Sequence, residues 1–295
     1  MRGLADPPPM RRAPMPTDVL LAVLFAALMH ACYHAIIKLG DDKIASLGLI
    51  AVFETVYGAV GATIFPAPPP DAWPWLIAAV ILQTIYRFFT CYAYRLGDLS
   101  QVMPIARGTA PLLVTLGSAL WLGEHLNATE IVAVAMIAVG VMTLAFARTA
   151  RGRFDGIAAG LAIISGVTVA AYSMIDGVGA RITGSASSYV WWLTMLGGVA
   201  FLVPALTVRG TQTLQLFRGR WYMGMLGAAF SCSTYWIVIW AMTRAPIGLV
   251  SALRETGVIF AVIIGDVFLK ERPGRVRLAA VALAASGIAL LKLGA

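Results

Sequence analysis

Charge is scarce in this sequence of 295 residues. Lys, Arg, Asp and Glu together make up 12% of the chain, whereas an ordinary soluble domain has roughly 25%. Hydrophobic residues make up 60%, and the mean hydropathy is +0.83. This composition excludes an ordinary soluble domain and predicts an integral membrane protein. The formal net charge of +8 is then a signal of membrane topology, and no nucleic acid is needed to explain it.

Cysteines and catalytic motifs are also scarce. The chain has three cysteines, an odd number without the spacing of metal ligands, and we interpret all three as core packing: Cys32, Cys91 and Cys232. Neither HExxH nor GxSxG occurs, and the NAT triplet at residues 127–129 is interpreted as a chance match to the glycosylation pattern. We therefore expect no enzyme, no catalytic residue, no cofactor and no metal ion.

Apolar runs of about 20 residues, the length that crosses a bilayer as a helix, recur along the chain. Short stretches with Arg, Lys, Pro, Gly or Asp separate them. The runs predict ten transmembrane helices, near residues 19–39, 45–65, 74–94, 99–122, 128–146, 156–178, 186–206, 221–243, 247–268 and 276–293. We expect an all-α membrane protein whose function resides within the bilayer.

The beginning of the chain has two possible interpretations. Residues 20–31 have the core length and the small residues of a signal peptide. The apolar segment continues through Leu39 and has a counterpart later in the chain, so we interpret it as the first helix, behind a tail of residues 1–18. Outside the predicted spans, six basic residues fall on the side of the termini and thirteen on the other side. This count predicts that both termini lie outside.

The sequence repeats itself. A shift of 147 residues, without a gap, superposes Arg107 on Arg254, Thr109 on Thr256, Leu122 on Leu269, Glu124 on Glu271, Val134 on Val281, Gly140 on Gly287 and Leu144 on Leu291. A weaker match at a shift of 139 superposes Tyr33 on Tyr172, Gly40 on Gly179, Thr55 on Thr194 and Gly58 on Gly197. The chain therefore divides into two halves, residues 19–146 and 156–293, joined by a linker of residues 147–155.

Each predicted half contains five helices, so the second half enters the membrane with the opposite orientation to the first. Inverted repeats of this kind (5+5) are typical of secondary transporters, whose sites lie near the bilayer midplane between the repeats. Arg107 and Arg254 each lie about eight residues into a helix, which is about 12 Å from opposite membrane faces at 1.5 Å per residue. In a hydrocarbon core roughly 30 Å thick, both arginines are expected near the midplane.

Residues 93–145 contain a proline-bearing helix, the triplet LGE and a late glycine, and residues 268–291 repeat this pattern. In these features the chain resembles the EamA repeat of the drug/metabolite transporter superfamily. It departs from the family at Lys270, where glycine is usual, and at HACYH (residues 30–34), where a Trp-Gly pair is common. The resemblance covers essentially the whole chain. It implies this fold and transport but no particular substrate, and it favours cytoplasmic termini, against the charge count.

Polar and aromatic residues recur at helical spacing on otherwise apolar segments, and such stripes would converge on one central cavity. Three examples are Gln83 with Tyr86 and Arg87, Ser165 with Thr168, Tyr172 and Asp176, and Ser231 with Thr234 and Tyr235. A charge buried at this depth costs at least roughly 2.5 to 3.5 kcal/mol, so intramembrane charges are expected to face a partner or a watery cavity. The predicted substrate-binding residues are His30, Tyr33, His34, Glu54, Tyr57, Tyr86, Arg87, Arg107, Tyr172, Trp192, Tyr235, Trp236, Arg254 and Glu255.

Two hypotheses account for the intramembrane charges. In the first, the cavity takes a zwitterionic or amphipathic metabolite, with Arg107 or Arg254 opposite a carboxylate and Glu54 or Glu255 opposite an amine. Tyrosines and tryptophans would then form apolar walls and cation-accepting faces. In the second, these charges and Arg87 pair among themselves as locks between helices. The sequence leaves both hypotheses open.

Three smaller features have alternatives of their own. His30 and His34, four residues apart, are a candidate metal or proton-relay pair, but no third ligand stands out. Glu54 is a candidate carrier of a coupling proton, a role that a fixed salt bridge would prevent. Glu124 and Glu271, just beyond their helices, are expected to be structural caps or loop contacts. A channel would use symmetric subunits around a filter, and a purely structural membrane protein would not need polar stripes.

Together these features predict a secondary transporter that works by alternating access, with the helices that begin near Pro104 and Pro246 as its moving elements. The stripes look most like those of exporters of neutral or aromatic amino acids, such as YddG-like exporters. The alternative is a proton-coupled multidrug exporter of flat organic cations, which would need Glu54 but not the arginines. The expected partners are a small-molecule substrate and the lipid bilayer, without nucleic acid. We expect a monomer in a bacterial inner membrane.

Overall fold

The structure is a computed structural model, and it describes residues 15–39, 42–96, 99–147, 156–260 and 274–293. All regular secondary structure in these ranges is helical, as predicted. The helices are α1 (Thr17–Leu39), α2 (Lys43–Ile64), η1 (Pro70–Ala72), α3 (Trp73–Leu96), α4 (Leu99–Trp121), α5 (Ala128–Ala147), α6 (Gly156–Thr183), α7 (Ala186–Arg209), α8 (Thr211–Met242), α9 (Ile247–Glu255) and α11 (Arg275–Leu293). Most of the predicted tail and linker, together with Lys270 and Glu271, lies outside the described residues.

Seven of the described helices are long and apolar enough to cross a membrane, namely α1, α2, α3, α6, α7, α8 and α11. A shorter apolar helix, Ala128–Leu144, lies within α5. Large apolar side chains such as Leu21, Phe25 and Val60 are exposed on these helices, as expected for surfaces that contact lipid. The protein is therefore a multi-pass integral membrane protein. The exact count of ten spans in two sets of five remains a prediction.

Two helices differ in length from the predicted spans. α6 continues to Thr183, beyond the predicted end near residue 178. α8 begins at Thr211 instead of near residue 221, and its helical backbone is interrupted at Arg220, with φ −131° and ψ 27°. The predicted start of this span therefore coincides with a kink inside a longer helix.

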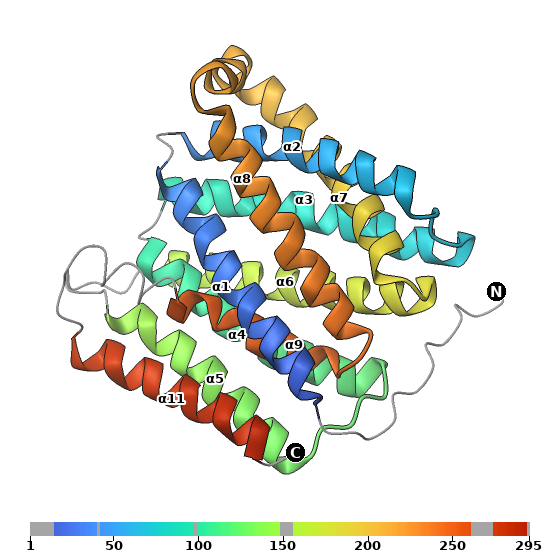
Figure 1. Cartoon of the computed structure of the whole chain (residues 1–295). Helices are drawn as coiled ribbons and strands as arrows, with labels where there is room; N and C mark the ends of the chain where they lie inside the picture. The colour runs from blue at the N-terminus through green and yellow to red at the C-terminus, as the bar shows by residue number, and fades with distance from the viewer. Residues whose placement is uncertain (1–14, 40–41, 97–98, 148–155, 261–273, 294–295) are drawn as a thin grey trace.

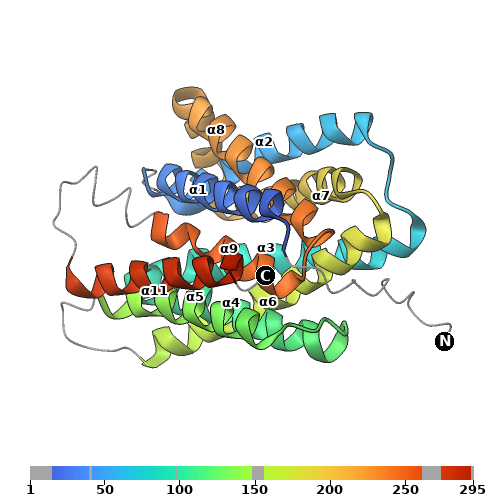
Figure 2. The same cartoon turned by 60° about the horizontal axis from the view of Figure 1, so that its bottom comes forward.

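Helices of each half pack against helices of the other half, and equivalent helices make equivalent contacts. α2 lies along α7, and α5 lies along α11, at opposite sides of the molecule (Figure 1). The pair of α5 and α11 also lies side by side in the turned view of Figure 2. α1 packs on α8 and α9, just as α6 packs on α3 and α4. These contacts obey the sequence repeat, which makes α1 equivalent to α6, α3 to α8, and α4 to α9.

Two repeat glycines allow the close approach of α5 and α11. A Cβ atom at Gly140 would lie 2.9 Å from the carbonyl oxygen of Ala280. A Cβ atom at Gly287 would lie 2.9 Å from the carbonyl oxygen of Ala133. A side chain at either position would push the helices apart, which is why small residues mark such contacts in membranes. The two glycines that the shift of 147 superposes thus make the same contact from opposite sides.

One end of the molecule is held together by Arg181 at the end of α6. Its guanidinium donates to Glu124 Oε1 at 2.6 Å and to the carbonyl oxygens of Met242 and Ala245 at 2.9 and 3.2 Å. Glu124 Oε2 accepts the backbone N–H of Ile247, the first residue of α9, at 2.9 Å. Glu124 therefore caps a helix of the other half, a structural role of the kind predicted for it. We call these five residues the end latch.

Candidate functional site

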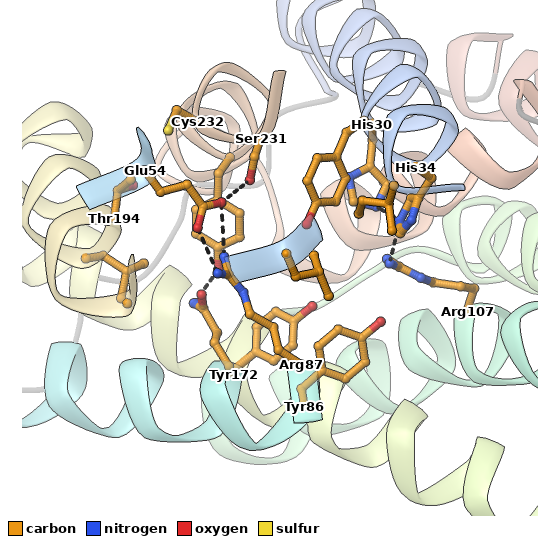
Figure 3. Close-up of a pocket in the computed structure, with 17 residues that line it drawn as sticks. His30, His34, Glu54, Tyr86, Arg87, Arg107, Tyr172, Thr194, Ser231 and Cys232 are labelled. Atoms are coloured by element: carbon orange, nitrogen blue, oxygen red, sulfur yellow. Dashed lines mark hydrogen bonds and ion pairs between the residues drawn. The ribbon is translucent and has the colours of Figure 1, made fainter. Parts of the chain in front are cut away.

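A cavity of about 120 Å³ lies among seven helices, α1 to α4 and α6 to α8 (Figure 3). Its walls combine charged side chains with imidazole, phenol and hydroxyl groups. Nine of the fourteen predicted binding residues line it: His30, Tyr33, His34, Glu54, Tyr86, Arg87, Arg107, Tyr172 and Tyr235. Polar stripes on separate helices therefore meet in one place.

Glu54 and Arg87 form a two-point ion pair on one wall of the cavity (Figure 3). Arg87 Nη1 donates to Oε2 at 2.7 Å, and Nη2 donates to Oε1 at 3.1 Å. The hydroxyl of Ser231 donates to Oε1 as well, at 2.7 Å, so the pair joins α2, α3 and α8. The guanidinium of Arg87 also lies 5.7 Å from the centre of the Phe201 ring. Bidentate pairs of this kind are strong, and each charge here is compensated by the other.

Arg107 lies across the cavity from Glu54 and is held differently (Figure 3). Its Nη1 donates to Glu255 Oε2 at 3.2 Å. Arg254 donates to the other oxygen of the same carboxylate from Nε at 3.1 Å and from Nη2 at 2.9 Å. The first half supplies no second carboxylate, because the shift of 147 places Gly108 opposite Glu255. We call Arg107, Arg254 and Glu255 the arginine triad; their exposed fractions are 4%, 4% and 1%.

The helices that carry the triad contain an interruption or helix-breaking prolines. α9 ends at Glu255, Thr256 lies outside the helix, and residues 257–260 are helical again. α4, the repeat equivalent of α9, contains Pro104 and Pro111, and Pro246 precedes the first residue of α9. Interrupted helices at membrane depth are found where the backbone is buried in protein or lines a cavity, and transporters often build their sites from them.

His30 and His34 lie one turn apart on α1, and their Nε2 atoms are 3.1 Å apart. Nη2 of Arg107 lies 3.4 Å from Nε2 of His34. Both contacts use the same Nε2 atom of His34, and the tautomers of the two rings decide which group donates in each contact. The described residues contain no group of three or more His, Cys, Asp or Glu placed to hold a metal ion. The two histidines therefore present a hydrogen-bonded polar edge beside Arg107.

Tyrosines form the aromatic part of the wall. The rings of Tyr86 and Tyr172 have centroids 5.8 Å apart. The guanidinium of Arg254 lies 5.9 Å from the centre of the Tyr172 ring, which connects this wall to the triad. On α1, the ring of Tyr33 stacks against that of His30 at 5.8 Å. Aromatic faces are thus available to the apolar or cationic part of a ligand.

Five predicted binding residues lie outside the lining: Tyr57, Trp192, Trp236, Arg254 and Glu255. The last two are behind Arg107, in the triad. The three aromatic residues contact other helices. Tyr57 donates its hydroxyl to the carbonyl oxygen of Met225 at 3.3 Å, and Trp192 packs edge-on against Trp73 at 5.5 Å. Trp236 donates to a serine hydroxyl of α7 at 3.0 Å.

Three polar residues from the sequence stripes lie at the cavity but are absent from the predicted set, as is Thr194 of α7. Gln83 and Ser231 line the cavity, and Asp176 lies behind Gln83 and Tyr235 with none of its surface exposed. All three belong to the polar stripes that the sequence shows at helical spacing, which is the signal that identifies them. Cys232, interpreted from the sequence as core packing, also lines the cavity.

A multi-pass helical membrane protein with exchanged halves and a polar cavity between them has the architecture of a membrane transport protein. The sequence profile of the EamA-like transporter family matches residues 18–146 and, a second time, residues 156–293. The chain belongs to the EamA-like transporter family, within the drug/metabolite transporter superfamily, and so is a transporter of small molecules and not an enzyme. It contains two EamA repeats.

The other comparisons add the fold alone. No curated protein matches this sequence. One solved structure, described only as the crystal structure of a protein, matches with a TM-score of 0.73 at 17% sequence identity. The match covers 95% of this chain and 96% of the other chain, so the likeness extends over the whole fold.

Proposed function

We propose that this transporter exports small amphipathic metabolites, in particular neutral or aromatic amino acids, by alternating access through the cavity between its halves. The arginine triad carries this proposal. Two guanidinium groups share one carboxylate, and Arg107, one of the two, faces the cavity. The triad therefore has one positive charge in excess at membrane depth. A substrate carboxylate would compensate that charge with charge-assisted hydrogen bonds.

The remaining walls favour the rest of an amino acid. Tyr33, Tyr86 and Tyr172 offer aromatic faces to an apolar side chain or to an ammonium group. Both glutamates considered as amine partners are occupied, Glu54 by Arg87 and Glu255 by the two arginines of the triad. We therefore assign the contact with the substrate amine to the tyrosine faces in this conformation.

Two observations weigh against the alternative, a multidrug exporter of flat cations. Such an exporter would need Glu54 as a free carboxylate, but both oxygens of Glu54 accept hydrogen bonds from Arg87. The cavity of about 120 Å³ is also smaller than the roughly 300 to 1,000 Å³ of sites for drug-sized ligands. A single amino acid fits this volume better than a multi-ring cation does.

The setting of the protein is part of the same proposal. A cavity formed entirely within one chain supports function as a monomer. The bacterial inner membrane, the outward direction of transport and the YddG-like branch rest on the sequence resemblance. The interruption after Glu255 and the prolines of α4 support these two helices as the moving elements.

Counterflow in proteoliposomes tests the function. Liposomes are preloaded with one unlabelled neutral, aromatic, basic or acidic amino acid, and uptake of a labelled amino acid is followed. We expect exchange with neutral or aromatic amino acids. The Arg107→Gln variant should lose it, because no cation remains to face the substrate carboxylate. Glu255 keeps its pair with Arg254 in this variant, so the fold should be retained.

Arg244→Gln is the matched control, since Arg244 is an exposed arginine that lies over the ring of Trp240, away from the cavity. It should exchange substrate like the unmodified protein. Full exchange in folded Arg107→Gln would refute the carboxylate contact. Folded protein that exchanges none of the amino acids in the panel would refute the proposed substrate class.

A further inference from the structure

Asp176 on α6 is a buried carboxyl group that no arginine holds. Four residues with carboxyl groups are buried in the part of the chain that the structure describes: Glu54, Glu124, Asp176 and Glu255. Each of the three glutamates forms an ion pair with an arginine. Asp176, with 0% of its surface exposed, takes part in none of the ion pairs among the described residues. The contact with substrate proposed above does not use it.

Neutral donors from three other helices surround this carboxyl group. Tyr189 of α7 donates to Oδ1 at 3.0 Å, and Gln83 of α3 donates to Oδ2 at 3.0 Å. The hydroxyl of Tyr235, on α8, also donates to Oδ2. Gln83 and Tyr235 are hydrogen-bonded to each other at 2.8 Å, and both line the cavity. Asp176 is therefore one hydrogen bond away from the cavity wall.

Burial and hydrogen bonding have opposite effects on the ionised form of Asp176. Burial away from water penalises the carboxylate, whereas three donors to its oxygens favour it. Protonation also changes the local hydrogen bonds, because a neutral carboxyl group has an O–H that must itself find an acceptor. At least one present donor then has to turn, and Gln83 and Tyr235 are the donors on the cavity wall. A proton on Oδ2 of Asp176, the oxygen that Gln83 and Tyr235 contact, thus changes the wall that the substrate meets.

The charged and titratable groups that face Asp176 come from four helices. They are Tyr189 on α7, Tyr235 on α8, Arg254 on α9 and Tyr172, which lies four residues before Asp176 on the same face of α6. Arg254 Nη2 lies 3.4 Å from the hydroxyl of Ser173, one turn before Asp176 on the same helix. The cation that acts electrostatically on this carboxyl group is Arg254, a member of the triad. Adding or removing a proton at Asp176 changes the field at the site that would hold the substrate carboxylate.

We propose that Asp176 is the proton-exchanging carboxyl group of the transport cycle and that it couples movement of the substrate to a proton gradient. In each cycle the carboxylate gains one proton from water on one side of the membrane and releases it to water on the other. This inference rests on the proposed transport function. It places the proton at Asp176 instead of Glu54, whose two-point pair with Arg87 leaves its carboxylate fixed.

Asp176→Asn tests the proposal, because the amide keeps the shape of the side chain and cannot exchange a proton. Two quantities are measured in proteoliposomes: counterflow at equal pH on both sides, and net flux driven by an imposed pH gradient of either sign. We expect the unmodified protein to respond to the gradient. The variant should keep counterflow and lose the gradient-driven flux. Asp71→Asn, which changes an exposed aspartate in η1, should keep both.

Two outcomes would overturn the assignment: a response to the gradient in Asp176→Asn, or counterflow in the unmodified protein without any response to a gradient. Absence of counterflow in the unmodified protein would refute the proposed function instead. Infrared spectra without substrate then decide the role of Asp176. A pH-dependent band of a protonated carboxyl group that is lost in Asp176→Asn supports the assignment, and the same band in both proteins overturns it.

A second variant serves if Asp176→Asn does not fold. Tyr189→Phe removes the donor to Oδ1 but keeps the carboxyl group, and Tyr189 is not among the residues that line the cavity. The pH profile of gradient-driven flux should be displaced in this variant, since the hydrogen bond acts on the two forms of Asp176 unequally. An unchanged profile would show that Asp176 does not carry the proton.

Discussion

At the scale of single residues, the intramembrane arginines differ in how completely their charge is compensated. Arg87 has Glu54 to itself at two points, whereas Arg107 shares Glu255 with Arg254. The first arrangement joins helices and leaves no charge for a ligand. The second leaves one positive charge in excess beside the cavity. Locking and binding are therefore separate roles of different arginines in the proposed site.

The structural role of the Glu54–Arg87 ion pair can be tested by a double-mutant cycle. Glu54→Gln leaves Arg87 without its carboxylate, and we expect the free energy of unfolding to fall by about 3 kcal/mol. This is the low end for a broken buried pair, because 21% of the Arg87 side chain is exposed. The double variant Glu54→Gln with Arg87→Gln should recover part of the loss, since no charge stays buried. Chemical denaturation in detergent measures all four proteins, and equal stability of Glu54→Gln and the unmodified protein would contradict the lock.

Much of the cavity wall could be predicted from helical spacing, because residues three or four apart share a face whatever the tertiary structure. Helical spacing does not distinguish residues that line the cavity from residues that pack between helices. Trp192 and Trp236 are as plausible on sequence grounds as Tyr86, yet they contact neighbouring helices. Asp176 belongs to a predicted polar stripe but is absent from the predicted binding set, because spacing does not show that its carboxyl group lies behind Gln83 and Tyr235.

At the scale of helices, the pairing of α2 with α7 depends on Gly198. A Cβ atom there would lie 2.4 Å from Thr55 Oγ1 and 2.9 Å from the carbonyl oxygen of Ala51. At the adjacent Gly197 a Cβ atom would have no atom within 4 Å, and this glycine lines the cavity. Neighbouring glycines of one helix thus have different surroundings, so each serves as a control for the other.

Alanine substitutions at these two positions should have opposite effects. Gly198→Ala is expected to destabilise the protein by about 1 to 3 kcal/mol, because the backbone of α2 has to move for the added methyl group. Gly197→Ala should be neutral or stabilising by up to about 1 kcal/mol, since alanine favours a helix over glycine. Thermal unfolding in one detergent compares them. Gly197→Ala should show the slower counterflow of the two variants, because its methyl group lies in the cavity. Equal stability of the two variants would contradict the close contact at Gly198.

The interruption after the triad has no clear signal in the sequence. No proline lies near Thr256, and the sequence predicts one uninterrupted span from 247 to 268. At this point the chain lies close to α1, since a Cβ atom at Gly257 would lie 2.8 Å from the carbonyl oxygen of Ala27. Contacts between helices that are distant in sequence decide where a helix bends, and spacing within one helix does not report them.

At the scale of the whole molecule, the end latch closes the end at which α6 and α8 terminate. Met242, Ala245 and Ile247 of the latch belong to the largest apolar core cluster, which has members from both halves. In the proposed alternating-access cycle this end has to open when the cavity faces its side of the membrane. Opening separates Glu124 from Arg181 and from the start of α9. The latch is thus expected to set the balance between the two states.

Glu124→Gln should shift that balance toward the open state, because it removes the charge partner of Arg181. The measurement is the rate at which a water-soluble maleimide labels Ala245→Cys in a background without the native cysteines. Ala245 is 1% exposed, so labelling should be slow until this end opens. We expect Glu124→Gln to accelerate it about fivefold or more, which corresponds to a shift of about 1 kcal/mol.

Glu130→Gln is the matched control for the latch. Glu130 accepts the backbone N–H of Asn127 at 2.8 Å, and its own N–H donates to the Asn127 side chain at 2.8 Å, so it caps α5 outside the latch. It should leave the labelling rate of Ala245→Cys unchanged. Equal rates in Glu124→Gln and in the protein with an intact latch would show that the latch does not govern this end.

The shared carboxylate of the triad also bears on how the protein is made. Arg107 and Glu255 are 148 residues apart in the chain. At about 5 to 20 residues per second, a ribosome needs roughly 7 to 30 s to reach the glutamate after the arginine. During that interval α4 carries a cation whose counter-ion has not yet been synthesised. The charge of Arg107 is therefore compensated only after the second half has been synthesised. A nascent chain that stops before Glu255 leaves the Arg107 guanidinium in the bilayer without its carboxylate partner.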